Sequence, residues 1–259
     1  MQAEAALLDQ LGEIADGCTV AIGGLGSDRR PMGLLRSLVA ADVGDLTVVS
    51  FLGGLDVEFL LAAGIVAHLH TAGTSLDAAG LAPGYRHARQ TGHPRVHEWG
   101  EGSLHAALES AARGLPWLPT RTSVGSDVVA TNARLVVVDD PFGGGPVVVA
   151  GALPIDLALV HVPAASVHGD LFHDGDPGVD DVLVRAARRV VVSTDTIVER
   201  PSSRATISRL WVDQVVHLPG GSWPTPCSGT EPGDPSAASR WVAADTRRPE
   251  LLWEGAANG

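Results

Sequence analysis

The sequence of 259 residues has a formal net charge of −12, and none of its 18 basic side chains is a lysine. Without a basic run it lacks the electrostatic footprint of a nucleic-acid or anionic-membrane partner, and without lysine it has neither Schiff-base chemistry nor a P-loop lysine. Hydrophobic residues make up 45% of the chain and aromatics only 4%, so we expect a soluble single domain over residues 1–259 with a Val, Leu and Ala core.

The first half of the chain alternates strands and helices. Strands are predicted at 19–23, 46–51, 65–71 and 96–99, and helices at 1–15, from Pro31 onward, at 57–63 and at 103–113. Glycines at 17, 64 and 114 follow three of these helices and mark their ends. Because strand and helix alternate, we predict an α/β fold with a doubly wound, mostly parallel sheet and helices on both faces.

The second half is rich in Val, Ile and Leu. Strands are predicted at 135–139, 147–151, 155–162 and 190–193, and a helix at 180–189. Continuous apolar strands are typical of a sheet that is buried on both faces. Residues 219–235 are predicted as a long Pro/Gly/Ser loop, either functional or mobile, and residues 247–259 as a loosely held tail.

The loops after the parallel strands are expected to share one face, because ligands collect at the carboxyl ends of strands in such sheets. The loop at 23–31 contains Gly23, Gly24 and Gly26, whose backbone can approach a ligand closely and whose N–H groups can bind an anion or oxyanion. The alternative is a tight turn that needs glycine for its own conformation. A dinucleotide fingerprint is excluded, since Arg29 stands where its third glycine would be.

Two charged features adjoin these loops. Arg29 and Arg30 precede a helix, where positive charge opposes the helix dipole and a bound anion would relieve the repulsion; the alternative is a solvated pair without a role. Glu101 lies between Gly100 and Gly102, where the following helix favours the ionised carboxylate that a nucleophile or general base requires. For Glu101 the alternative is an ordinary capping charge in a first helical turn.

Metal and thiol chemistry find little support in the sequence. His68 and His70 share a strand face, but no third ligand completes a site at a recognised spacing, so no metal is predicted. Cys18 and Cys227 are too few and too far apart for a disulfide framework, which fits a cytoplasmic protein. No G-x-S-x-G elbow is present, and Cys227 has no evident base.

Several short motifs in chain order resemble those of the alpha subunits of family I CoA transferases, from about Ala15 to Ser228. Segment 23–31 is similar to the family's glycine-rich loop ending in a basic residue and proline, and segments 45–49, 115–119, 140–142 and 219–222 are similar to further signatures. The resemblance implies a CoA-transferase-like fold, a partner beta subunit, and an acyl-CoA substrate, with no bound cofactor apart from the CoA of that substrate. The residues it implies in binding the acyl-CoA are Gly24, Leu25, Gly26, Ser27, Arg29 and Arg30.

Within this family, Glu101-Gly102 is most similar to a turn in the branch that opens steroid rings, where the alpha subunit supplies a catalytic Glu. In the transferases the nucleophilic Glu belongs to the beta subunit. The resemblance therefore implies an acyl-CoA hydrolase of steroid degradation with Glu101 as catalytic residue; the alternatives are a CoA transferase and a non-catalytic CoA-binding partner subunit. The chain departs from the family at His168-Gly169-Asp170 and at Asp195, and the acyl group and the choice between heterodimer and heterotetramer stay open.

Overall fold

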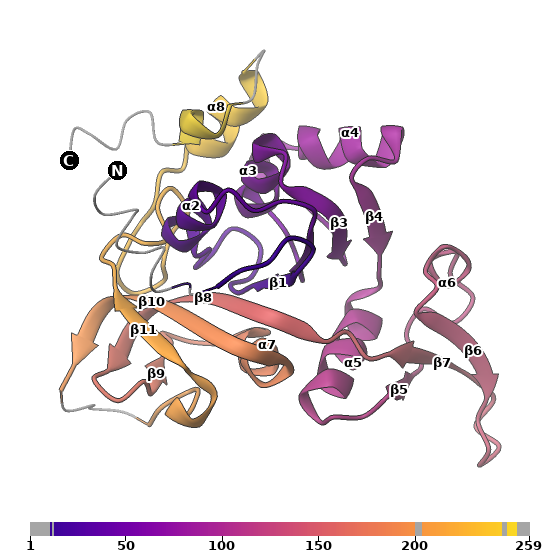
Figure 1. Ribbon diagram of the computed structural model, residues 1–259. Coiled ribbons are helices and arrows are strands. Elements are labelled where there is room, and N and C mark those ends of the chain that lie inside the picture. The colour runs from indigo at the N-terminus through magenta and orange to yellow at the C-terminus, as the bar shows by residue number, and fades with distance from the viewer. Residues whose placement is uncertain (1–10, 12, 200–203, 245–247, 253–259) are drawn as a thin grey trace.

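The computed structural model describes residues 11, 13–199, 204–244 and 248–252. A large sheet occupies its centre, with the strand order β11-β10-β8-β1-β2-β3-β4 (Figure 1). The strands are β1 (Thr19–Ile22), β2 (Leu46–Ser50), β3 (Val66–Thr71), β4 (Arg95–Glu98), β8 (Ile155–Ser166), β10 (Ala187–Val198) and β11 (Gln214–His217). Every neighbouring pair in this order is parallel, and β9 (Leu171–Phe172) pairs with β8 in the antiparallel sense.

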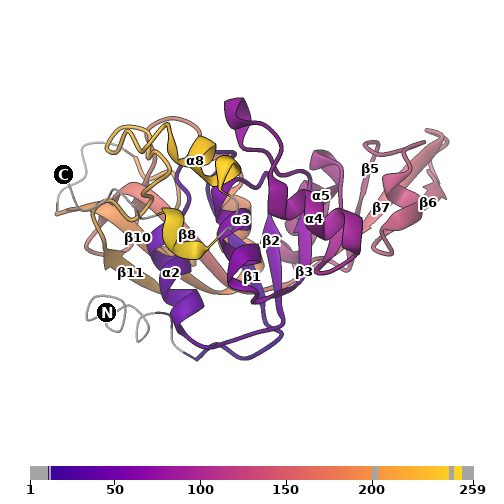
Figure 2. The ribbon, with the colours of Figure 1, turned by 90° about the horizontal axis from the view of Figure 1, so that it is seen from above.

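Helices cover both faces of this sheet, because successive side chains of a strand point to opposite sides. On one face, Val20 and Ile22 join a core with α2 (Met32–Ala40) and α3 (Leu55–Ala63). On the other face, Ala21 joins a second core with α5 (Glu101–Ala112) and α7 (Asp180–Ala186). Figures 1 and 2 place α4 (Pro83–Thr91) and α8 (Ala237–Ala243) on the same side as α2 and α3. The predicted doubly wound α/β fold is confirmed.

A second sheet corrects part of the sequence analysis. The strands β5 (Trp117–Thr120), β7 (Pro146–Gly151) and β6 (Leu135–Asp139) pair in this order, and both pairings are antiparallel. The strands predicted at 135–139 and 147–151 therefore belong to a small sheet outside the parallel one. Only residues 140–145 connect β6 to β7, whereas a parallel crossover needs a dozen residues or more. Residues 136–138 of β6 are exposed, contrary to the predicted burial on both faces.

Two of the helices that the sequence analysis missed are held by one buried carboxylate. Glu58 of α3 accepts the backbone N–H groups of Gly84 and Tyr85, at 2.9 and 2.8 Å, and so caps the first turn of α4. Its Oε2 also accepts the indole N–H of Trp241 in α8 at 2.8 Å. Because these donors come from segments far apart in the chain, no local sequence pattern indicates the arrangement.

The C-terminal part follows the prediction in some places and departs from it in others. Residues 219–235 contain no regular helix or strand, as predicted. Within the predicted tail, residues 249–252 form the 3₁₀ helix η3 (Pro249–Leu252), and Leu252 is buried in the core. The helix predicted at 180–189 ends at Ala186, where β10 begins. Of the helix predicted at 1–15, residues 1–10 and 12 lie outside the described residues, and residues 13–15 are not helical.

Among the described residues, no helix is long and apolar enough to cross a membrane.

Candidate functional site

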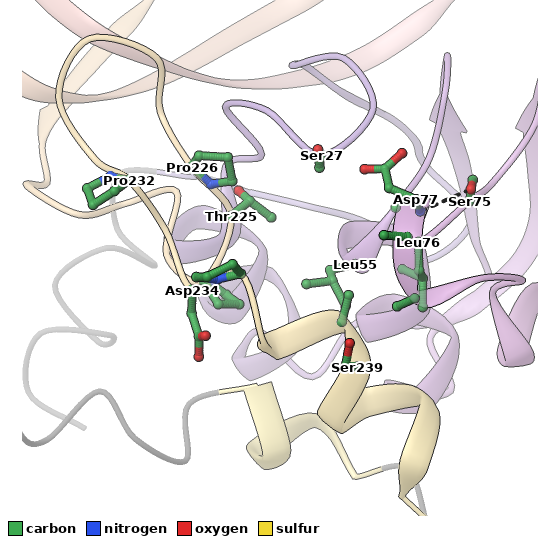
Figure 3. Close-up of a pocket in the computed structure, with 16 residues that line it drawn as sticks. Ser27, Leu55, Ser75, Leu76, Asp77, Thr225, Pro226, Pro232, Asp234 and Ser239 are labelled. Atoms are coloured by element: carbon green, nitrogen blue, oxygen red, sulfur yellow. Dashed lines mark hydrogen bonds between the residues drawn. The ribbon is translucent and has the colours of Figure 1, made fainter.

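The loops that follow β1, β2 and β3 enclose a cavity of about 300 Å³ together with segment 224–239. Figure 3 shows Ser75 and Asp77 on one side of this cavity and Thr225 and Asp234 on the other, with Ser27 between them. Among the described residues that line it, hydroxyl groups, prolines and small apolar side chains predominate, two residues are acidic and none is basic. The cavity therefore suits an uncharged, mostly apolar group and disfavours a phosphate.

The glycine-rich loop uses some of its own N–H groups internally. The Gly24 N–H donates to Asp180 Oδ1 at 2.7 Å, and the Leu25 N–H donates to the Asp28 carbonyl at 3.2 Å. Within the described part of the chain, no group accepts a hydrogen bond from the N–H of Gly26 or Ser27. Of the predicted backbone donors at 24–27, only these last two are free to bind an oxyanion.

Gly24 is required by the turn itself. Its φ is 81°, and a Cβ at this position would lie 2.4 Å from the carbonyl oxygen of Asp28. The acceptor of its N–H, Asp180, is buried and is held in turn by His173, whose Nε2 lies 3.1 Å from Asp180 Oδ2. His173 Nδ1 lies 2.7 Å from the Thr206 hydroxyl. A chain of hydrogen bonds from the β9 side of the molecule thus fixes the start of the loop.

Arg30 is fully buried and occupied by contacts within the chain. Its guanidinium donates to the carbonyls of Gly23, Gly26 and Leu52, and its Nη1 lies 3.4 Å from Oδ2 of the buried Asp56. The prediction that Arg30 binds a ligand phosphate does not fit this environment, because the guanidinium has no exposed surface. Arg30 instead joins the loops after β1 and β2, so its role is to hold their shape.

Arg29 is also buried, but one of its donors stays without a partner. Its backbone has a φ of 53°, in the left-handed region that a non-glycine residue seldom adopts. Its Nη1 lies 2.5 Å from Asp28 Oδ2, and its Nη2 donates to the Asp176 carbonyl at 3.2 Å. Nε has no hydrogen-bond partner among the described residues. Of the two arginines, Arg29 is therefore the one with an unpartnered donor, but this Nε is buried and faces no open surface.

Glu101 is the first residue of α5, directly beyond the carboxyl end of β4, and its side chain is exposed. Within the described residues its carboxylate has no hydrogen-bond or ion-pair partner. The cap of α5 is built by Ser103, whose hydroxyl accepts the Gly100 N–H at 3.1 Å. Glu101 therefore makes no capping hydrogen bond with a described residue, and the alternative of an ordinary charge in the first turn of α5 stays open, because this charge faces the positive end of the helix dipole.

Close packing explains why both residues beside Glu101 are glycines. A Cβ on Gly100 would lie 2.6 Å from Ser123 Oγ, and one on Gly102 would lie 2.6 Å from Thr122 Cγ2. These positions need glycine because the loop at 122–123 packs against them, and not only to leave room for a substrate. Ser123 also donates to Ser103 Oγ at 3.3 Å, so this loop supports the start of α5.

The sheet order separates Glu101 from the glycine-rich loop. The strands β2 and β3 lie between β1 and β4, and at about 4.8 Å for each spacing the ends of β1 and β4 are about 14 Å apart. Glu101 does not line the cavity that Ser27 helps to form. The two predicted parts of the site therefore share one edge of the sheet but face different parts of any substrate that reaches both.

Sequence reasoning missed several residues of the cavity, above all Asp77. This residue begins the 3₁₀ helix η1 (Asp77–Ala79), has a φ of 50°, and its carboxylate has no partner within the described residues. A loop at 72–80 is expected on this face, but the spacing of its residues resembles no catalytic motif. Thr225 and Asp234 come from the long loop and the segment after it, and only the tertiary fold brings them to the cavity.

A row of histidines lies beneath the β3–β4 edge, near Glu101. His70 stacks on His97 with ring centroids 4.3 Å apart, and His70 Nδ1 accepts the indole N–H of Trp99 at 3.1 Å. Burial, together with the neighbouring His97, lowers the pKa of His70 to about 3. Since His70 is neutral at physiological pH, it serves as a hydrogen-bond acceptor that holds the Trp99 ring.

Comparisons with known proteins show the family of this chain. A family model described as Coenzyme A transferase matches residues 6–218. The cholesterol ring-cleaving hydrolase IpdA subunit of Rhodococcus jostii (strain RHA1) is 36% identical over 261 residues, which cover 95% of this chain and 87% of that protein. The corresponding subunit of glutaconate CoA-transferase from Acidaminococcus fermentans is 24% identical over 238 residues, covering 83% and 74% of the two chains.

Two solved structures have the same fold. A variant of the decarboxylase AibA/AibB superposes with a TM-score of 0.87 at 32% identity, covering 96% of this chain and 95% of that one. Glutaconate coenzyme A-transferase from Acidaminococcus fermentans superposes with a TM-score of 0.86 at 22% identity, covering 98% and 86%. The chain belongs to the coenzyme A transferase family, and the relatives named as subunits imply that it works with a partner subunit.

Proposed function

We propose that this chain is the alpha-type subunit of a two-subunit acyl-CoA hydrolase that opens a carbon ring of its substrate, with Glu101 as general base. The carboxylate of Glu101 carries the proposal, because it is exposed at the carboxyl edge of the sheet and has no partner within the described residues. By contrast, the carboxylates of Asp56 and Asp180, which contact the glycine-rich loop, are buried and accept hydrogen bonds. The similarity to a ring-cleaving hydrolase subunit supports the assignment.

The proposed reaction balances with water as the co-substrate. Glu101 takes a proton from water, and the hydroxide adds to a ring carbonyl carbon. The adjacent carbon–carbon bond then breaks, its electron pair remains on the leaving carbon as an enolate, and the proton held by Glu101 neutralises that carbon. No covalent acyl-enzyme forms, which distinguishes this route from the glutamyl-CoA thioester of a transferase.

Because the glycine-rich loop and the Glu101 turn lie apart, we propose that they contact different parts of a long substrate. The free N–H groups of Gly26 and Ser27 would bind the thioester oxygen, while Glu101, near the end of β4, would act on the ring. The weakly polar cavity beside Ser27 would take an apolar portion of the acyl-CoA. Arg29 would bind the thioester or a phosphate through its Nε only if the surrounding loop moves on substrate binding, because this atom is buried.

We also propose that the partner subunit covers the outer face of the small sheet. This face presents the apolar side chains of Trp117, Val136 and Val138, and Phe142 at the β6–β7 turn is 94% exposed. Trp117, Val138 and Phe142 line a shallow, mostly apolar cavity of about 430 Å³. An apolar surface of this kind marks an interaction site, and the relatives are named as subunits of two-subunit enzymes.

The test of the catalytic assignment is Glu101→Gln in the complex of this chain with its partner subunit. Turnover of a cyclic acyl-CoA is expected to fall about a hundredfold or more in kcat, because the amide cannot take a proton from water. Glu98→Gln is the matched control: Glu98 accepts the Tyr85 hydroxyl at 3.1 Å and pairs with Arg89 at 2.7 Å, so it has no free carboxylate for catalysis. Asp77→Asn tests the other exposed carboxylate of this edge.

Three outcomes separate the candidate activities. Loss of turnover in Glu101→Gln alone, with CoA binding and assembly intact, supports the hydrolase. Normal turnover in Glu101→Gln, a requirement for a free carboxylic acid as acceptor, and a hydroxylamine-trapped Glu on the partner subunit identify a transferase instead. Release of CO₂ from the substrate would transfer the assignment to the decarboxylase chemistry named for AibA/AibB.

A further inference from the structure

Three potential metal ligands from distant parts of the chain meet beneath the loop at 219–235. They are His161 on β8, Asp195 on β10 and Cys227 in the loop. One ligand atom of each lies within 4.8 Å of the other two. His161 and Cys227 are buried, and the Asp195 side chain is nearly so. The sequence analysis predicts no metal, because spacing along the chain gives no sign of this cluster.

The imidazole of His161 is oriented as a metal-binding imidazole is. Its Nδ1 lies 2.9 Å from the Ser193 hydroxyl, which fixes the ring. Its Nε2 faces the cluster and lies 3.3 Å from Asp195 Oδ1, yet the two are not aligned as a hydrogen bond, and Nε2 is a buried nitrogen without a partner among the described residues. An outer hydrogen bond to one ring nitrogen, with the other left open, is the usual environment of a histidine ligand.

Both carboxylate oxygens of Asp195 are also fixed by hydrogen bonds. Its Oδ1 accepts the Gly220 N–H at 2.8 Å, and its Oδ2 accepts the Thr230 hydroxyl. Burial alone would raise the pKa of Asp195, but His161, Thr230 and Gly220 together lower it to about 2. Burial raises the pKa of the Cys227 thiol to about 12. Without a cation, the cluster thus places a fixed carboxylate beside a neutral thiol and 3.3 Å from an imidazole nitrogen that has no hydrogen-bond partner among the described residues.

We propose that His161 Nε2, Asp195 Oδ1 and Cys227 Sγ bind a Zn²⁺ ion. Imidazole, carboxylate and thiolate are the ligands that Zn²⁺ takes in proteins, and a water molecule can fill the fourth tetrahedral position. Bonds of about 2.0–2.2 Å place neighbouring N and O ligands about 3.3 Å apart, as observed between His161 and Asp195. The carboxylate and thiolate balance the charge of the ion, which suits a buried site.

The ion would connect the long loop to the sheet. Next to Cys227, the Pro226 carbonyl accepts the Arg29 N–H at 2.8 Å, and the Ser228 N–H donates to Asp28 Oδ1 at 3.1 Å. Thr225 and Pro226 also line the cavity beside Ser27. The ion would therefore hold the cavity wall and the glycine-rich loop in register, and its three ligands are positioning residues for the substrate site.

The test uses the full-length chain, freed of metal with a chelator and titrated with Co²⁺ and Zn²⁺. One equivalent of Co²⁺ is expected to give the visible bands of a tetrahedral site and a thiolate-to-cobalt charge-transfer band, and Zn²⁺ is expected to displace it. Binding of Zn²⁺ to the metal-free chain should release protons and raise the Tm. The chain provides a matched pair of variants, because Cys18 and Cys227 are its two cysteines. Cys18→Ser is expected to behave as wild type, whereas Cys227→Ser should lose the charge-transfer band and bind Zn²⁺ more than about 100-fold more weakly, beyond the usual effect of an outer-shell change.

A further variant keeps the proposal testable if Cys227→Ser does not fold. Ser193→Ala removes only the hydrogen bond that orients His161 and is expected to weaken Zn²⁺ about 10- to 100-fold. The proposal is overturned if the wild-type chain binds no Co²⁺ or shows no thiolate band, or if Cys18→Ser abolishes binding while Cys227→Ser retains it. Because these measurements need neither the partner subunit nor turnover, their failure would leave the proposed hydrolase function unaffected.

Discussion

The two sheets of this protein contain similar valine-rich strands in different environments. In the parallel sheet, β8 and β10 are covered by α2 on one face and by α5 and α7 on the other, and Val160, Val191 and Val192 have no contact with solvent. In the small antiparallel sheet, β6 is exposed along most of its length. The same residue types therefore form a core in one sheet and an apolar surface in the other, because burial depends on which elements cover each face.

An arginine–aspartate pair beside each sheet gives the largest expected contrast in stability. Arg30→Met should destabilise the fold by about 3–5 kcal/mol, because it leaves the Asp56 carboxylate buried without its cation. Arg121→Met, at the small sheet, breaks an exposed contact with Asp140 at 3.7 Å and should cost at most about 1 kcal/mol. Urea unfolding of both variants measures the difference, and equal losses would contradict the assigned role of Arg30.

Substitution of one valine in each sheet compares the contribution of a buried and an exposed side chain to stability. Val160→Ala should lower the free energy of unfolding by about 1.5–3 kcal/mol, since this side chain is 0% exposed in the core of the parallel sheet. Val136→Ala, at a position 54% exposed on β6, should change it by less than about 0.5 kcal/mol. A loss at Val136 as large as that at Val160 would mean that another surface of the protein covers β6 in the purified chain.

Acid should destabilise the parallel sheet through His70. The folded-state pKa of about 3 lies below the unfolded value of 6.5, so the neutral ring contributes its stability above pH 6.5, and this stability is lost as pH falls from 6.5 toward 3. The slope is at most about 1.4 kcal/mol for each pH unit. Thermal melts between pH 7 and 4 measure it, and His70→Gln should reduce the slope.

The control for this pH effect is His105→Gln, which changes an exposed histidine of α5 and should leave the slope as in wild type. An unchanged slope in His70→Gln would assign the acid sensitivity to other groups.

Substitution of Phe142, at the exposed end of the small sheet, should have the smallest effect on stability but should weaken binding of the partner subunit. Phe142→Asp should alter the stability of the lone chain by less than about 0.5 kcal/mol, because the ring is 94% exposed. If the partner subunit covers this ring, the affinity of the chain for the partner should fall about tenfold or more. We also expect the lone chain to self-associate through its exposed apolar surface, and Phe142→Asp should weaken this self-association. Titration calorimetry and ultracentrifugation measure both.

Leu210→Asp provides the matched comparison for Phe142, because Leu210 is 82% exposed on η2 (Arg209–Trp211), outside the small sheet. The affinity of the Leu210→Asp variant for the partner subunit should equal that of the wild-type chain. Equal affinities in all three proteins would move the interface away from β5, β6 and β7.

Local sequence patterns predict the parallel part of the fold, and they predict that the candidate site residues lie in loops after its strands. The alternation of strands and helices, with Gly64 ending α3 and Pro31 preceding α2, depends on local backbone preferences, which a sequence expresses directly. The glycine-rich turn and Glu101 were found in the same way, because both follow predicted strands. These features depend on residues close together in the chain.

Contacts between distant segments could not be predicted from the sequence and are visible only in the folded structure. The tertiary structure pairs the Gly24 N–H with Asp180, buries Arg30 against Asp56, and brings His161, Asp195 and Cys227 together from two strands and a loop. In the folded structure β6 is also exposed to solvent, although its valines alone suggest a buried strand. Hydrogen-bond occupancy and burial depend on which distant groups fill the space around a residue, so they become fixed only when the whole chain is packed.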